Sequence, residues 1–338
     1  MRKHIWDLQM QRSRGKRRKD NLKKVVLLGE PMALLLADQE GPLPDVSHFT
    51  RTVSGAEVNV AIGLRRLGIP VEFLTRLGDD PFGHYIELML KNNGIGTGMI
   101  AFDSEYRTGI QLKECVSDGR DPYAPYYRKG SAASHMTESD MEALDMSDVG
   151  MIHVTGIPPA LSESMRKAVF ALVKRAKIKQ IPVSFDPNLR PALWENEARM
   201  CEVLNELSGY ADFVFPGITE CRILTGTDDK KKAAEFYHRK GVGTVVIKDG
   251  KLGAFLSTDC PDGGRSEKQI PGFPVSRVVD TVGAGDGFAA GFLSGFLEQL
   301  PLEACVLRAN AIGALQVQHR GDNEGLPTRE QLEAFISH

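Results

Sequence analysis

The chain has 338 residues, of which 42% are hydrophobic and 25% charged, so it is long enough for one large domain with a smaller appendage. A net charge of −2 excludes a general attraction to nucleic acid or to an anionic membrane surface. No apolar run approaches the roughly 20 residues that cross a bilayer, and the start lacks the apolar core of a signal peptide. We therefore expect a cytoplasmic protein with no nucleic-acid partner and no membrane partner.

Residues 1–24 are dense in arginine and lysine and lack apolar periodicity, which predicts a basic, disordered tail before a domain at 25–338. Short apolar runs typical of buried parallel strands then recur at 25–29, 150–154, 183–186, 211–215 and 244–247. Helical patterns separate them at 58–67, 83–92, 161–177 and 230–240. Strands that alternate with helices predict an α/β fold, in which a parallel sheet binds ligands at the carboxyl ends of its strands.

Two regions interrupt this alternation, at about 34–52 and about 108–129. In the second region, polar and apolar residues alternate between Gly109 and Val116, and a turn is expected at Asp118–Gly119. This pattern predicts antiparallel strands, so we expect a small second sheet.

The most informative motif is D-T-V-G-A-G-D-G-F, which opens an apolar helix near the end of the chain. Small residues at Gly283, Ala284 and Gly285 let backbone N–H groups point at an anion, at the positive end of that helix. Asp286 can accept the proton of a substrate hydroxyl while the amides stabilise a transferred phosphoryl group. At a helix N-terminus Asp286 should be a weak base that acts through its position. A glycine-rich helix start that only packs closely would look similar in isolation.

The residues from Asp280 to Phe288 resemble the C-terminal signature of the ribokinase-like (PfkB) carbohydrate kinases, D-T-x-G-A-G-D-x-F. A second signature, a glycine turn followed by N-x-A-x-x-L-x-x-L-G, is similar to Ser54–Gly68. The resemblance extends over about 25–327. It implies a ribokinase-like fold with a mostly parallel central sheet flanked by helices, and a small β-sheet lid that excludes water and forms a homo-oligomer interface. It also implies ATP and Mg²⁺ as cofactors.

The nucleotide-binding residues follow from the same resemblance, because the Walker sequence is absent. The stretch at 246–253 looks like the family's nucleotide loop, although a β-hairpin turn would give the same pattern. Asn310 matches a position bordering the adenine site, although a polar contact inside a helix would also explain it. The implied cofactor-binding residues are Asn188, Lys248, Asp249, Gly250, Gly253, Gly283, Gly285 and Asn310.

One acidic residue is implied for the metal. Relatives supply an N-x-x-E element, and Glu220 occupies its acidic position, but Gly217 stands where the asparagine would be. Mg²⁺ usually takes few protein ligands, so water could bridge this gap. The five cysteines are scattered without a C-x-x-C pair, which indicates reduced thiols and no zinc site.

Two arginines bear on the substrate. Arg128 follows Tyr126 and a second tyrosine in Y-Y-R-K-G-S-A, and Arg190 ends D-P-N-L-R. A planar guanidinium suits bidentate capture of a carboxylate, so a converging pair indicates an acidic sugar, whereas either alone is better explained by an ion pair. Both stretches, and the G-E-P-M that begins at Gly29, resemble 2-keto-3-deoxygluconate kinases. Gln111 departs from this pattern, since some of these kinases carry tyrosine there. The other implied substrate contacts are Gly55, Ala56, Asn59, Asp286 and Asp322.

We therefore expect an ATP-dependent kinase that converts 2-keto-3-deoxygluconate (2-dehydro-3-deoxy-D-gluconate) to its 6-phosphate. A fructokinase or another PfkB sugar kinase is the alternative among enzymes. A sugar-binding regulatory protein without turnover is an alternative of another class, and Asp286 argues against it. The basic tail offers a variant of this alternative, a nucleic-acid-associated protein. A nicotinamide-dependent dehydrogenase is less favoured, since no G-x-G-x-x-G follows the first strand.

Overall fold

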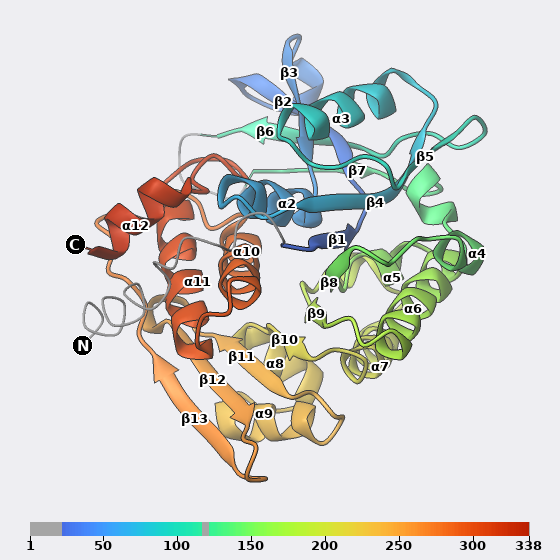
Figure 1. The fold of residues 1–338 in the computed structure, drawn as a ribbon. Coiled ribbons are helices and arrows are strands. Elements are labelled where there is room, and N and C mark those ends of the chain that lie inside the picture. The colour runs from blue at the N-terminus through green and yellow to red at the C-terminus, as the bar shows by residue number, and fades with distance from the viewer. Residues whose placement is uncertain (1–21, 117–121, 338) are drawn as a thin grey trace.

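The fold is described by a computed structural model that covers residues 22–116 and 122–337. The basic tail predicted at 1–24 lies almost wholly outside the described residues, as does the turn predicted at Asp118–Gly119. Within them, the chain forms one large sheet with helices on both faces and a second, small sheet, as Figure 1 shows. The α/β class predicted from the sequence is confirmed.

The large sheet has nine strands among the described residues, and six of its eight neighbouring strand pairs are parallel. The two exceptions are at one edge, where β12 pairs antiparallel with both β11 and β13 and therefore runs opposite to the other strands. In spatial order the strands are β13 (Arg265–Ile270), β12 (Ala254–Asp259), β11 (Thr244–Lys248), β10 (Phe213–Val214), β9 (Val183–Asp186), β8 (Val149–Thr155), β1 (Lys24–Leu28), β4 (Val71–Gly78) and β5 (Ile100–Asp103).

Strand β1 shows why the sheet needs helices on both faces. Val25 and Leu27 belong to one hydrophobic cluster, and Val26 and Leu28 belong to the other, so the continuous apolar run is buried on both sides. The first cluster is covered by α2 (Ala56–Arg66), α3 (Pro81–Asn92), α10 (Ala284–Leu297), α11 (Leu302–Gln316) and α12 (Arg329–Ser337). The second is covered by α4 (Glu138–Glu142), α5 (Pro158–Leu161), α6 (Glu163–Ile178), α7 (Glu197–Ser208), α8 (Ile218–Thr225) and α9 (Lys230–His238).

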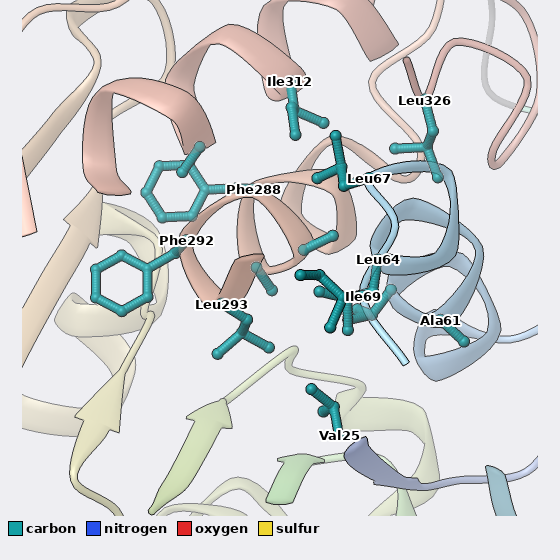
Figure 2. Packing of buried hydrophobic residues seen from close by; sticks show 14 of the residues in the cluster. Val25, Ala61, Leu64, Leu67, Ile69, Phe288, Phe292, Leu293, Ile312 and Leu326 are labelled. Carbon is teal, nitrogen blue, oxygen red and sulfur yellow. The ribbon is translucent and has the colours of Figure 1, made fainter. Parts of the chain in front are cut away.

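Helix α10 lies at the centre of the first cluster, and it is buried along most of its length. Its phenylalanines pack toward the sheet, and its small residues face its neighbours, since a Cβ at Gly63 of α2 would lie 2.8 Å from Ala290 Cβ. Figure 2 shows α10 beside α2. A Cβ at Gly291 would lie 2.7 Å from the Cα of Ala309, so only glycine lets α11 approach this closely. Each fully buried Phe contributes about 1.5–3 kcal/mol of hydrophobic stabilisation, which fixes α10 and therefore the position of its N-terminus.

The small sheet has the spatial order β3 (Phe49–Ser54), β2 (Met32–Glu40), β6 (Ile110–Cys115) and β7 (Tyr126–Tyr127). Strands β2 and β3 pair antiparallel, as do β6 and β7, in line with the prediction from alternation. The central pair, β2 and β6, runs parallel. The chain between β2 and β6 passes through three further strands and two helices, and so makes the long crossover that a parallel pair needs.

No helix in residues 22–116 or 122–337 combines the length and the apolar character needed to cross a membrane. All five cysteines lie in the described part of the chain, and each is a free thiol there, as their scattered spacing predicted.

Candidate active site

A cavity of about 550 Å³ lies between the small sheet and the carboxyl ends of the large sheet. Strand β1 has β4 on one side and β8 on the other, so the strand order reverses there, which is where open α/β sheets bind ligands. Asp186 at the end of β9 and Lys248 at the end of β11 line the cavity floor. The predicted site residues that line it are Gly55, Ala56, Asn59, Tyr126, Arg128, Asn188, Arg190, Glu220, Lys248, Gly283, Gly285, Asp286 and Asp322.

Asp286 is in the first turn of α10 and is 9% exposed. Its Oδ2 accepts a hydrogen bond from Asn59 Nδ2 at 2.8 Å, and its Oδ1 accepts one from Asn188 Nδ2 at 3.3 Å. The pKa of Asp286 is raised to about 7, chiefly by burial; the charges of Asp186 and Glu57 add to the rise, and the Asn59 hydrogen bond opposes it. The expectation of a weak base is therefore wrong, because burial beside two other acids outweighs the helix end.

The turn before Asp286 depends on one glycine. Gly283 is the N-cap of α10 with φ of +75°, in the left-handed region, and a Cβ there would overlap the backbone oxygen of Asp322. An α-helix leaves its first N–H groups without intrahelical acceptors, and Gly285 presents this end of α10 to the cavity. A Cβ at Gly285 would lie 3.5 Å from Lys248 Nζ. A helix N-terminus and an ammonium group therefore meet at one point, as an anion site requires.

Lys248 is paired within the site. Its Nζ donates to Asp186 Oδ2 at 2.6 Å. Burial alone would lower the pKa of Lys248, but the charges of Asp186, Glu220 and Asp286 raise it above its ordinary value. The ammonium group therefore stays charged at neutral pH, and it can stabilise negative charge that develops beside Gly285.

Glu220 has a structural task of its own. Its Oε2 accepts from the Gly217 N–H at 2.7 Å and its Oε1 from the Leu189 N–H at 2.9 Å, so it caps α8 and ties down the loop after β9. Burial raises the pKa of Glu220, Asp186 adds to the rise, and Lys248 opposes it. The described residues contain no group of three His, Cys, Asp or Glu side chains that could hold a metal ion. Mg²⁺ usually takes only one or two carboxylates besides water and phosphate, and the role of Glu220 toward the metal stays a prediction.

The two arginines both line the cavity, but one is buried and the other is exposed. Arg128 is 9% exposed and is held by Glu30, whose Oε2 accepts from Arg128 Nε at 2.7 Å and lies 2.5 Å from Nη2. Arg190 is exposed, and it donates to the Leu189 carbonyl oxygen at 2.9 Å. Burial raises the pKa of Glu57, while the charges of both arginines lower it, so both guanidinium groups act on this acid of the cavity.

Four predicted nucleotide-binding residues do not line this cavity: Asp249, Gly250, Gly253 and Asn310. Two of them meet at the segment 270–272. Gly253, with φ of +91°, leaves no room for a Cβ against Gly272, and Asn310 Nδ2 donates to the carbonyl oxygens of Ile270 at 3.1 Å and Pro271 at 3.2 Å. Asp249 pairs with Lys230 at 2.6 Å. Ala284 lies in the anion turn between two glycines that do line the cavity.

Sequence reasoning missed a lysine on the lid. Lys113 lines the cavity from β6, and its Nζ donates to Asp322 Oδ1 at 2.9 Å. The next residue, Asn323, donates to Asn59 Oδ1 at 3.2 Å, so the segment at 320–323 connects the small sheet to the residue that holds Asp286. Strand alternation places Lys113 on the same face as Gln111, and this signal could have identified it.

Comparison with known proteins agrees with this geometry. The chain is 45% identical over 313 residues to the 2-dehydro-3-deoxygluconokinase of Bacillus subtilis (strain 168), covering 92% of this chain and 95% of that one. Its fold matches the crystal structure of a PfkB protein from Polaromonas sp. JS666 with a TM-score of 0.83 and 40% identity, over 92% and 99% of the two chains. It also matches a fructokinase from Vibrio cholerae O395 with bound fructose, ADP and calcium, with a TM-score of 0.79 and 28% identity over 94% and 100%.

The model of the pfkB family of carbohydrate kinases matches residues 22–329, which is nearly the whole described chain. The ribokinase-like fold implied by the two sequence signatures is thereby confirmed. The chain belongs to the pfkB family of carbohydrate kinases.

Proposed function

We propose that this protein transfers the terminal phosphoryl group of ATP to 2-dehydro-3-deoxy-D-gluconate, giving the 6-phosphate and ADP. The observation that carries the proposal is the position of Asp286, a buried carboxylate with a pKa of about 7 beside the open N-terminus of α10. A group with that pKa can take a proton near neutral pH, and the helix end can hold the group being transferred. The name of the Bacillus subtilis relative supports the choice of sugar.

In this mechanism the terminal hydroxyl of the sugar donates a hydrogen bond to Asp286, which takes its proton as the oxygen attacks the γ-phosphorus. The bond from phosphorus to the β,γ-bridging oxygen breaks, and ADP leaves. Asn59 and Asn188 hold the carboxylate in place through their amide donors. The amides after Gly283 and the ammonium group of Lys248 stabilise the charge on the phosphoryl oxygens.

The other end of the sugar is assigned to the arginines. A carboxylate offers two oxygens to a guanidinium fork, and both Arg128 and Arg190 line the cavity. Mg²⁺ would neutralise the nucleotide phosphates, and Glu220, which lines the cavity, would hold it directly or through water. The small sheet closes over this reaction and excludes water, which would otherwise accept the phosphoryl group.

The test is a coupled assay of ADP release across a panel of sugars and sugar acids. We expect kcat/KM for 2-dehydro-3-deoxygluconate to exceed that for fructose by about 100-fold or more, because a site built for a charged group rejects analogues that lack it. Equal rates on fructose and the sugar acid would remove the carboxylate argument and favour the fructokinase alternative.

Arg190→Ala separates the two alternatives, since this exposed side chain donates to a neighbouring carbonyl oxygen, and we expect its removal to leave folding intact. We expect its KM for the sugar acid to rise by about 10- to 100-fold, because a charge-assisted hydrogen bond to the carboxylate is lost. Its KM for fructose should not change. Arg128→Ala is less informative, because it would leave the buried Glu30 without its charge partner.

A further inference from the structure

Two buried polar atoms on the cavity wall have no hydrogen-bond partner among the described residues: the hydroxyl oxygen of Ser54 and Oε1 of Glu30. Each residue is 2% exposed, and both line the cavity. An unpaired buried polar atom costs folding free energy, because it loses water without gaining a partner. These two atoms therefore weaken the free protein, and a ligand that paired with them would remove that cost.

The fold brings the two residues to one wall. Ser54 ends β3 and lies opposite Met32 in β2, and Glu30 precedes Met32 by two residues. Side chains two apart in an extended chain share a face, and all three of these residues line the cavity. The backbones are also close, since a Cβ at Gly55 would lie 3.2 Å from the Glu30 carbonyl oxygen.

The chemistry of the two atoms defines what can pair with them. Glu30 Oε2 accepts a hydrogen bond from Arg128 in an ion pair. The other oxygen, Oε1, can therefore only accept a hydrogen bond. The Ser54 hydroxyl can donate as well as accept. A sugar hydroxyl satisfies both, since it can donate to Glu30 and accept from Ser54. A ketone or carboxylate oxygen has no proton to offer Glu30.

We propose that Ser54 and Glu30 form a subsite for a sugar hydroxyl beside Arg128, and that this subsite determines which sugar acids the enzyme accepts. The inference rests on the proposed function and extends it. Glu30 has a second task here, because the same carboxylate orients the Arg128 guanidinium through its other oxygen. Binding of the sugar pairs the two free atoms, so the site favours a ligand with a hydroxyl near its carboxylate.

Ser54→Ala tests the subsite, and Thr75→Val is its matched control. Thr75 is 1% exposed and its hydroxyl also lacks a partner among the described residues, but it does not line the cavity. We expect Ser54→Ala to raise KM for 2-dehydro-3-deoxygluconate about tenfold with kcat nearly unchanged, the effect of one lost hydrogen bond. Its Tm without sugar should equal or exceed that of the wild type, because an unpaired polar atom has gone. Thr75→Val should leave KM unchanged.

An unchanged KM for Ser54→Ala, or a KM effect accompanied by a lower Tm without sugar, would overturn the inference.

Combining Ser54→Ala with Glu30→Gln tests whether the two residues share one hydroxyl. Glutamine keeps an oxygen for Arg128, but it can present an amide in place of Oε1. If the hydroxyl is shared, the combined KM effect is smaller than the product of the single effects, and a full product contradicts sharing. If the wild type phosphorylates no sugar acid, the proposed function fails, and the same variants test the subsite on the sugar that is phosphorylated.

Discussion

Asp286 is a carboxylate held where its charge is poorly solvated, beside Asp186 and Glu57. Because its pKa is higher in the folded protein than in the unfolded chain, ionisation of Asp286 lowers the free energy of unfolding. This cost begins as the pH rises through the unfolded pKa near 4 and is complete above about 7. Function at this residue therefore opposes stability.

We expect Asp286→Asn to reduce kcat by about 100- to 10,000-fold, the loss of a general base, while the sugar still binds. At pH 8 the variant should be more stable than the wild type by on the order of 2 kcal/mol, and this gain should vanish near pH 4. Urea unfolding at both pH values measures it. Lower stability at pH 8 would contradict the burial of an ionised Asp286.

The pH profile gives a second prediction at the same residue. Because Asp286 acts in its ionised form, kcat/KM should fall as the pH drops below about 7. The Asn59 amide stabilises that ionised form, so Asn59→Leu should raise the pKa and move the acid limb of the profile to higher pH. A profile that keeps its midpoint while only its height falls would show that Asn59 does not tune the base.

At the scale of an element, the turn before α10 combines a left-handed backbone with close packing. We expect Gly283→Ala to abolish measurable activity, because the new Cβ meets the Asp322 carbonyl and must displace the turn. Gly226→Ala is the matched control, since Gly226 has the same φ of +75° and nothing within 4 Å of its Cβ position. It should cost about 1 kcal/mol of stability and leave kcat unchanged. Circular dichroism and the ADP assay on both variants separate the effect of backbone strain, which both share, from the steric clash with Asp322, which only Gly283→Ala introduces.

The connection between lid and body is also a property of elements. Lys113 on β6 pairs with Asp322, and Arg320 Nη2 donates to the Val116 carbonyl oxygen at 2.5 Å, so two contacts tie the small sheet to the segment at 320–322. We expect Lys113→Met to lower kcat/KM for the sugar about tenfold, since Asp322 loses a charge-assisted hydrogen bond. Unaltered kinetics would mean that the Lys113–Asp322 ion pair has no effect on sugar binding or turnover. The control is Lys91→Met, which removes an exposed ion pair on a helix.

Local patterns account for what the sequence could predict about these elements. The apolar run at 25–29 predicted β1 because every residue in it is buried, and the D-T-V-G-A-G-D-G-F motif identified the anion turn because its parts are adjacent. Strand β13 was not predicted, since R-S-E-K-Q-I has no apolar alternation. The pairs Glu30–Arg128 and Lys113–Asp322 were missed for another reason: their members lie 98 and 209 positions apart, and the fold alone brings them together.

On the scale of the whole molecule, association through the small sheet remains a prediction. Its β7 carries Tyr127, which is 63% exposed, and large exposed aromatic residues are enriched at interfaces. We expect Tyr127→Glu to reduce the molar mass measured by light scattering at micromolar concentration. Ile178→Glu, at a site 82% exposed on the end of α6, should leave the mass unchanged. A wild-type protein of monomer mass would refute association by this surface.

The edge strand β13 has a consequence for the behaviour of concentrated solutions. Five of its six residues are exposed, and arginine, glutamate and lysine stand among them. An unpaired strand edge is a template on which another chain can add, and charged side chains along it make such addition unfavourable. Replacing Arg265, Glu267 and Lys268 by valine would therefore be expected to convert a clear stock into one that forms thioflavin-positive fibrils, even if every catalytic group stayed in place.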